Sequence, residues 1–193
     1  MLRKRLQELD PIMALTVVLV VAALIALVVA LNATAAAAAG GGISTDGTSG
    51  KQTSGKPGKA KLKKNGKALP PPDAPRRVVK AIEAGNEIRR KPYKWGGGHG
   101  SFTDRGYDCS GAVSYVLHGA RMLKRPRASG GFMRWRKRGK GKWITVYAHG
   151  GHAFIEVAGL RFDTSGTGGE GPRWQKESRS KKGFKRRHYS KRF

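Results

Sequence analysis

The sequence predicts an α+β domain in which a helix packs on an antiparallel sheet. After Asp108, apolar residues recur on one side of a helix as far as Gly119. From His152 a β-rich stretch runs to Val157, and a short turn leads into a return strand that ends near Ser165. A helix followed by a hairpin is typical of a small α+β fold, and the start of this helix carries the candidate site.

Two helices are expected, and each begins at a favourable residue. The stripe on the second helix is Ala112, Val113, Val116 and Leu117. Asp108 is a good N-cap residue, so Cys109 and Ser110 are expected in the first turn. The first helix is expected to open at Pro75 and to close near Arg90, shortly before another proline.

Cys109 is the only cysteine of the 193 residues. In an exported chain it has no partner for an internal disulfide, so it serves either as a small core residue or as a nucleophile, and composition alone does not separate the two. Its place at a helix start favours chemistry. The unpaired N–H groups and the positive end of the helix stabilise a thiolate, and the same amides can bind an oxyanion.

A thiol nucleophile requires a base, and His152 is the leading candidate among five histidines. It begins the predicted strand, whose backbone would hold the imidazole rigidly, and the two glycines before it allow close approach. His149 is the main competitor, three residues earlier on the loop side. The other three, His99, His118 and His188, are interpreted as loop, capping or tail residues.

A third polar group should orient the imidazole, and Asp163 is the better of two candidates. The turn at Ala158 and Gly159 brings the return strand back beside His152, and Asp163 lies on that strand. Glu156 lies on the same strand as His152, but four residues along it is about 13 Å away. A simple capping role for Asp163 at the strand end stays open.

Three motifs resemble the signature blocks of the NlpC family of bacterial cell-wall peptidases, which are compact papain-like cysteine peptidases. They are the Tyr-Lys-Trp-Gly-Gly block at 93–97, the Tyr-Asp-Cys-Ser-Gly block at 107–111 and the Gly-His-Ala-Phe-Ile block at 151–155. The resemblance covers roughly residues 75–165. The first two blocks are specific, and the histidine block is less so.

The resemblance implies roles for six residues. It makes Cys109 the nucleophile, His152 the base and Asp163 the third residue. The residues that it places beside the substrate are Tyr93, Asp108 and Ser110. Family members typically cut the bond between D-glutamate and a diamino acid in the peptidoglycan stem peptide. Asp163 departs from the family, which usually has histidine, asparagine or glutamine there, and a usual Gly-Asp-Leu turn is replaced by residues 141–146.

The chain divides into five predicted segments. Residues 1–10 form a basic N-terminus, and the uncharged apolar stretch 11–31 is long enough for a transmembrane signal-anchor, although the alanines that follow also suit a cleaved signal peptide. Residues 32–74 are predicted to be a flexible linker of Gly, Ser, Lys and Pro, 75–172 the peptidase domain and 173–193 a basic tail. Lys and Arg are absent from 32–50, so the N-terminus is expected in the cytoplasm and the domain outside.

The charge is extreme, with 39 Lys and Arg against 12 Asp and Glu and a formal net charge of +27. Such a field predicts polyanionic surroundings, and for an exported chain these are anionic cell-envelope polymers, which makes nucleic acid an unlikely partner. A solvated basic tail without a specific partner stays open. One cysteine excludes a cysteine-rich zinc site, and no metal or cofactor is expected.

The sequence therefore indicates a cysteine endopeptidase of peptidoglycan, tethered to the cell membrane or secreted to the wall. Two alternatives remain from other classes. One is an amidase or acyltransferase on the same fold, and the other is a non-catalytic basic module that binds anionic envelope polymers. The sequence does not determine the oligomeric state.

Overall fold

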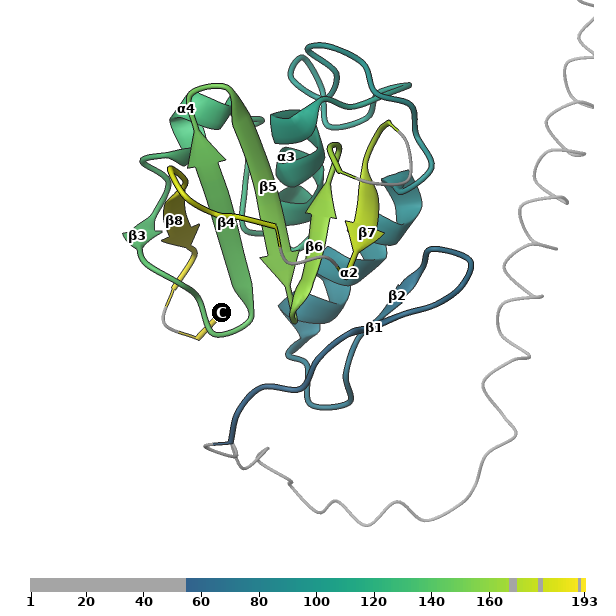
Figure 1. Ribbon diagram of the computed structural model, residues 1–193, viewed down its shortest axis with the longest axis vertical. Helices are drawn as coiled ribbons and strands as arrows, with labels where there is room; N and C mark the ends of the chain where they lie inside the picture. Colours follow the sequence, from purple (N-terminus) through teal and green to yellow (C-terminus); the bar gives the residue numbers. More distant parts are fainter. Residues whose placement is uncertain (1–54, 167–169, 177–178, 191) are drawn as a thin grey trace, which may run out of the picture. The chain divides into compact units, whose positions relative to one another are not determined.

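A six-stranded antiparallel sheet lies at the centre of the computed structural model, which describes residues 55–166, 170–176, 179–190 and 192–193 (Figure 1). The strand order is β3-β8-β4-β5-β6-β7. The strands are β3 (Lys137–Arg138), β4 (Ile144–His149), β5 (His152–Val157), β6 (Leu160–Asp163), β7 (Arg173–Gln175) and β8 (Lys185–His188). The adjacent strands β4, β5 and β6 are buried at nearly every residue, so both faces of the sheet are covered over these strands.

Two long helices cover one side of this sheet. They are α2 (Arg76–Ile88) and α3 (Cys109–Gly119), and a short helix α4 (Ser129–Phe132) follows. Helices α2 and α3 pack against each other, and α3 packs on β5 and β6 (Figure 1). All four residues of the apolar stripe on α3 are buried, as are Val78 and Ile82 of α2. These stripes place the core between the helices and the sheet.

The predicted α+β class, with α3 on an antiparallel sheet, is therefore confirmed. Helix α3 begins directly after Asp108, which is its N-cap, and β5 begins at His152. Strands β5 and β6 form the predicted hairpin. Its two turn residues, Ala158 and Gly159, have φ values of 47° and 82°. Positive φ at both central residues is typical of the two-residue turn whose twist matches that of the two strands it joins.

The segment expected as a flexible linker differs from that expectation over its last part. Strands β1 (Lys61–Leu62) and β2 (Ala68–Leu69) form a hairpin. The side chain of Asn86 on α2 bonds both the N–H and the C=O of Ala68, at 2.8 and 2.9 Å, and the N–H of Ala60 donates to the C=O of Ala158. The hairpin is thus ordered by polar contacts with distant residues, which its own lysine-rich composition does not reveal.

The expected basic tail also differs, because residues 173–193 supply two strands of the sheet. Strand β7 pairs with β6, and β8 lies between β3 and β4. Trp174 is buried, its ring packs on Phe162, and a Cβ at Gly85 of α2 would overlap it. Basic side chains occupy β8 in two ways: Lys185 and Arg186 are exposed, whereas Arg187 is buried and donates a hydrogen bond to the C=O of Met133 at 2.6 Å. The compact unit accordingly spans 54–193 and extends beyond the expected 75–172 at both ends.

The predicted membrane segment 11–31 lies outside the described residues, as do residues 1–10 and most of the predicted linker. Among the helices of the described ranges, none has the length and apolar character needed to span a bilayer.

Trp174 provides a test of whether the C-terminal residues belong to the fold. We expect Trp174→Ala to lower the free energy of unfolding by about 3–5 kcal/mol, because it empties a filled core position. Trp95→Ala is the matched control, since Trp95 is 86% exposed and its loss should change stability by less than about 0.5 kcal/mol. Urea unfolding measures both values. Equal, small effects would contradict the placement of β7 in the core.

Candidate active site

Cys109 is the first residue of α3 and is partly exposed. The Asp108 side chain accepts a hydrogen bond from the N–H of Gly111 at 2.7 Å, and its C=O accepts one from Ala112. Among the described residues, no hydrogen bond uses the N–H groups of Cys109 and Ser110. Two donors at the positive end of the helix therefore remain available beside the thiol.

A glycine-rich loop lies against this helix start. A Cβ at Gly111 would collide with the C=O of Gly97, and the N–H of Asp108 donates to the same oxygen at 3.3 Å. The loop is also held by the N–H of Gly96, which donates to the Asp108 carboxylate at 3.2 Å. The glycines of the two motif blocks thus have a packing role: they let the loop backbone approach the nucleophile closely.

His152 lies at the start of β5 with a side chain that is 19% exposed. Its Nε2 is 2.9 Å from Oδ1 of Asp163. Burial lowers the pKa of His152, but hydrogen bonds with Asp163 and Cys109 and the negative charges of both groups outweigh it and raise the pKa to about 9. Because Nε2 is engaged by Asp163, Nδ1 is the nitrogen left for Cys109. The three sequence-predicted catalytic residues are therefore brought together.

The Asp163 carboxylate is fully buried and has several donors around it. Arg161 donates to Oδ2 through Nε at 2.8 Å and through Nη2, and Arg179 donates to the same oxygen at 3.1 Å. The N–H of Ser165 donates to Oδ1 at 3.1 Å. Burial raises the pKa of Asp163, but the His152 hydrogen bond and charge, Arg161 and Ser165 together hold it below its usual value. Asp163 is thus an anion with a fixed orientation, which a simple capping residue need not be.

Arg161 is a site residue that the sequence reasoning missed, although its spacing carries a signal. It lies two residues before Asp163 on β6, so both side chains project from the same face. Arg161 is 4% exposed, and its guanidinium lies 3.4 Å from the centroid of the Phe154 ring. Arg179 comes from the segment between β7 and β8, and nothing in the sequence indicates that it reaches this site. Both are positioning residues, since they contact Asp163.

The residues implied to bind substrate have different surroundings from one another. Tyr93 is 40% exposed, and its backbone pairs with that of Tyr107, two residues before Cys109. The pKa of its hydroxyl is raised by partial burial and by the charges of Cys109, Asp108 and Glu170. Asp108 and Ser110 are buried. Both contact Nε2 of His99, at 3.0 and 3.1 Å. Their polar atoms are thus engaged within the protein, and His99 is a further residue of the site.

The two residues considered as alternatives, His149 and Glu156, contact other groups. The ring of His149 packs against Phe184, and its Nδ1 accepts a hydrogen bond from the N–H of Gly151. Glu156 accepts a hydrogen bond from Tyr147 at 2.9 Å and forms an ion pair with Lys181. The geometry therefore favours His152 over His149 as the base, and Asp163 over Glu156 as the orienting residue.

Comparison with known proteins gives matches among solved structures alone: no family model matches the chain, and no curated protein matches it. A hypothetical invasion protein from Mycobacterium tuberculosis is 23% identical, with a TM-score of 0.45 over 58% of this chain and 62% of its own. The peptidoglycan hydrolase RipB from the same organism is 25% identical, with a TM-score of 0.45 over 59% of this chain and 68% of its own.

A third solved structure is RipD from M. tuberculosis, described as a non-catalytic NlpC/p60 domain protein adapted to peptidoglycan binding. It is 20% identical, with a TM-score of 0.44 over 58% of this chain and 97% of its own. The chain thus spans less than two thirds of the first of these proteins and nearly all of the third. RipD is thus described as an NlpC/p60 domain protein, the family that the three motifs of this chain resemble, and a P60 domain from M. avium subspecies paratuberculosis is a further similar structure.

Proposed function

We propose that this protein is a cysteine endopeptidase that hydrolyses amide bonds in peptidoglycan stem peptides. The observation that carries the proposal is the 2.9 Å hydrogen bond between His152 and Asp163, together with the interaction with Cys109 at the start of α3 that helps to raise the pKa of His152. A nucleophile, a base and an orienting group in this order are what acyl transfer requires. The motif resemblance supplies the substrate class, and within it the bond between D-glutamate and the diamino acid is the proposed target.

The proposed reaction proceeds in two halves. The Cys109 thiolate attacks the carbonyl carbon of the substrate and forms a C–S bond, and the oxygen becomes negative. The C–N bond then breaks as protonated His152 gives its proton to the leaving amine, which leaves a thioester. Water next attacks the thioester while His152 takes its proton, and the acid product departs as the thiolate forms again.

The transient oxyanion needs donors that are already in place. The N–H groups of Cys109 and Ser110 lie in the first turn of α3, and the backbone of Tyr93 pairs with that of Tyr107, two residues before the thiol. Fixed donors of this kind lower the barrier to acyl transfer strongly, because they need no reorganisation when charge develops on the oxygen. Tyr93 is therefore proposed as a substrate-contacting residue, whereas Asp108 and Ser110 are proposed to shape the cleft through His99.

The proposed place of action is outside the cytoplasm. The basic N-terminus and the apolar stretch 11–31 support a single membrane anchor with the domain on the outer side, and cleavage of that stretch would release the same domain to the wall. Peptidoglycan is the proposed partner in either case.

The nucleophile is tested by Cys109→Ala. Because the thiol is partly exposed and only one atom is removed, we expect the variant to fold normally and to lose hydrolysis of purified peptidoglycan entirely. Mass spectrometry of the digest identifies the bond that is cut. Release of intact stem peptides free of sugar would instead indicate an amidase, and transfer products would indicate an acyltransferase. Equal binding and no turnover by both proteins would indicate a non-catalytic module.

The orienting residue is tested by Asp163→Ala and Asp163→Asn. Loss of the carboxylate should lower turnover by roughly 10²–10⁴-fold in the alanine variant, as for a misplaced general base. Asparagine keeps an acceptor for His152, so its turnover should be higher, but it leaves buried Arg161 without a carboxylate and should cost stability by about 3–5 kcal/mol. Glu156→Gln is the control and should change turnover little. A silent Asp163→Ala variant would refute the assignment.

The pKa of His152 predicts the alkaline limit of activity. Since that pKa is raised from 6.5 to about 9, the protonated imidazole that pairs with the thiolate should persist to about pH 9, where kcat/KM should decline. The same shift favours the folded state fully below pH 6.5, and this contribution disappears as the pH rises to about 9. In Asp163→Ala the decline in kcat/KM should move toward pH 6.5. An unmoved limit would show that Asp163 does not act on His152.

A further inference from the structure

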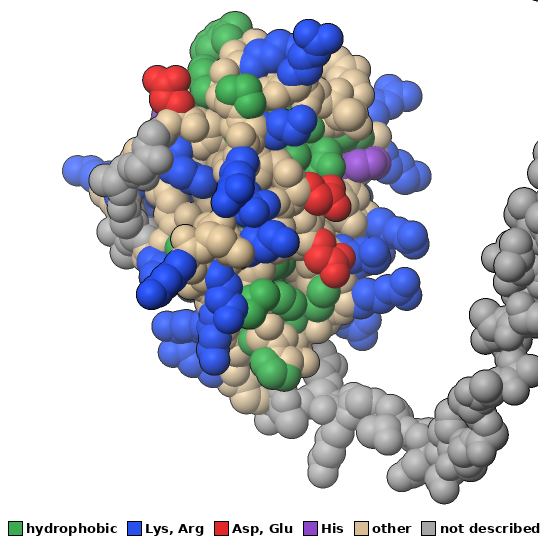
Figure 2. All heavy atoms as spheres, turned by 90° about the vertical axis from the view of Figure 1, so that its right-hand side faces the viewer, with side chains coloured by type: hydrophobic (Ala, Val, Ile, Leu, Met, Phe, Trp, Pro, Cys, Tyr) green, Lys and Arg blue, Asp and Glu red, His purple; other side chains and the backbone are tan. Residues whose placement is uncertain are grey.

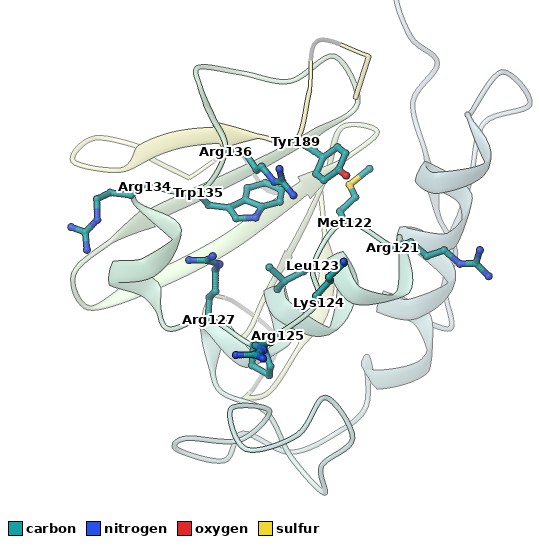
Figure 3. Close-up of a pocket in the computed structure, with 11 residues that line it drawn as sticks. Arg121, Met122, Leu123, Lys124, Arg125, Arg127, Arg134, Trp135, Arg136 and Tyr189 are labelled. Carbon is teal, nitrogen blue, oxygen red and sulfur yellow. The ribbon is translucent and has the colours of Figure 1, made fainter.

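Cationic side chains gather around a hollow at the C-terminal end of α3. The hollow has a volume of about 710 Å³ and is bordered by the segment 121–127, the segment 134–136 and Tyr189 (Figure 3). The charged residues that line it are Arg121, Lys124, Arg125, Arg127, Arg134 and Arg136. Of the described residues that border the hollow, none is acidic. We call this feature the arginine groove.

The cations of the arginine groove are available to a ligand. All six side chains are exposed, and among the ion pairs of the described residues none includes any of them. Like charges that converge without counter-charges repel one another, so the arrangement costs energy in the free protein. An anion in the groove would remove that cost.

The cations are arranged along the groove, not around a single point. Figure 3 shows Arg134 and Arg121 at opposite ends, each pointing outward, while Arg127 and Arg136 lie between them. A compact ligand such as one phosphate ion could contact only a few of these groups at once. The spread of charge suits an extended chain with regularly spaced anions.

Both borders of the groove are held in defined conformations. The Ser114 hydroxyl on α3 accepts a hydrogen bond from the N–H of Arg127 at 3.1 Å. Arg121 and Arg136 have φ values of 56° and 49°, and the third described non-glycine residue with positive φ is Ala158 in a hairpin turn. Such conformations are costly for arginine and persist where surrounding structure imposes them. The guanidinium of Arg136 also lies 4.8 Å from the centre of the Tyr189 ring.

We propose that the arginine groove binds a linear phosphodiester polymer, such as a polyol phosphate chain of the cell envelope. Five of the six cations are arginines, whose planar guanidinium matches two phosphate oxygens at once. Single-stranded nucleic acid would call for exposed aromatic rings on which bases stack. Trp135 in the groove is only 3% exposed, and the partly exposed ring of Tyr189 already lies against the guanidinium groups of Arg77 and Arg136. The concave shape favours an enclosed chain over a flat membrane surface.

The arginine groove is separate from the peptidase site. Helix α3 has 11 residues, so its two ends are about 16 Å apart, with Cys109 at one end and the groove beyond the other. A bound polymer would therefore hold the protein at the wall without covering the thiol. Polymer binding does not depend on catalysis, and Cys109→Ala should bind the polymer as the wild type does.

Cations also cover other parts of the surface, as Figure 2 shows for the face on the right of Figure 1. The test must therefore separate the groove from the general positive field. In the groove variant, Arg121, Arg125, Arg127 and Arg134 are changed to Gln. In the control variant, four exposed lysines of the β1–β2 hairpin are changed to Gln: Lys61, Lys63, Lys64 and Lys67. Both full-length variants lose the same charge.

Binding of fluorescently labelled poly(glycerol phosphate) is measured by anisotropy at physiological salt. We expect the groove variant to lose affinity by about tenfold or more, the sum of several small exposed contacts, and the control variant by less than about threefold. Replacing the same four arginines with lysine should restore much of the binding. Should the groove variant unfold, the single changes Arg125→Gln and Arg134→Gln take its place, each with a smaller expected loss.

Single-stranded DNA and vesicles that contain phosphatidylglycerol form the two comparison arms. A loss specific to the polyol phosphate chain supports the proposal. Equal losses in the groove and control variants would overturn it in favour of diffuse attraction. A larger loss toward DNA or vesicles than toward the polymer would also overturn it, and would assign the groove to nucleic acid or to the membrane. Absence of polymer binding by the wild type would overturn it as well.

Discussion

The buried carboxylate of Asp163 is the group on which the rest of the site depends. It contacts His152 from β5, Arg161 from its own strand and Arg179 from the segment after β7. A buried anion is stable only when donors surround it, so these contacts must form together as the sheet forms. The imidazole of His152 is thereby fixed within the sheet, and correct pairing of β5, β6 and β7 becomes a condition for the proposed activity of Cys109.

The scarcity of acidic residues gives several of them an organising role in this strongly cationic chain. Asp108 caps α3 and holds the glycine loop, and Asp104 pairs with Lys94 at 2.7 Å and accepts the N–H of Gly98. Glu156 fixes Lys181 beside the sheet. Because so few carboxylates offset the positive charge, most cations face solvent. Where several of them converge without an acid, as in the arginine groove, the protein retains a field that an external polyanion can neutralise.

The sequence predicted those parts of the fold that depend on interactions between residues close together in the chain. The N-cap at Asp108, the stripe on α3 and the turn at Ala158 follow from neighbouring residues, and so does the meeting of His152 with Asp163 across one hairpin. The β1–β2 hairpin was not predictable, because Asn86 orders it from a distant helix. Strand β8 resembles a basic tail in sequence, because its four residues, Lys185–His188, are all basic and include no apolar residue. The arginine groove joins segments separated in sequence, which no local pattern can reveal.

The coupling of Cys109 to His152 is tested most directly by the reactivity of the thiol itself. The chain has one cysteine, so alkylation by iodoacetamide reports on Cys109 alone. At about pH 6, we expect faster alkylation of the native protein than of the unfolded chain, since only the folded state pairs the thiolate with protonated His152. His152→Ala should abolish that difference. Slower alkylation of the native protein, or an unchanged rate in His152→Ala, would contradict the coupled pair.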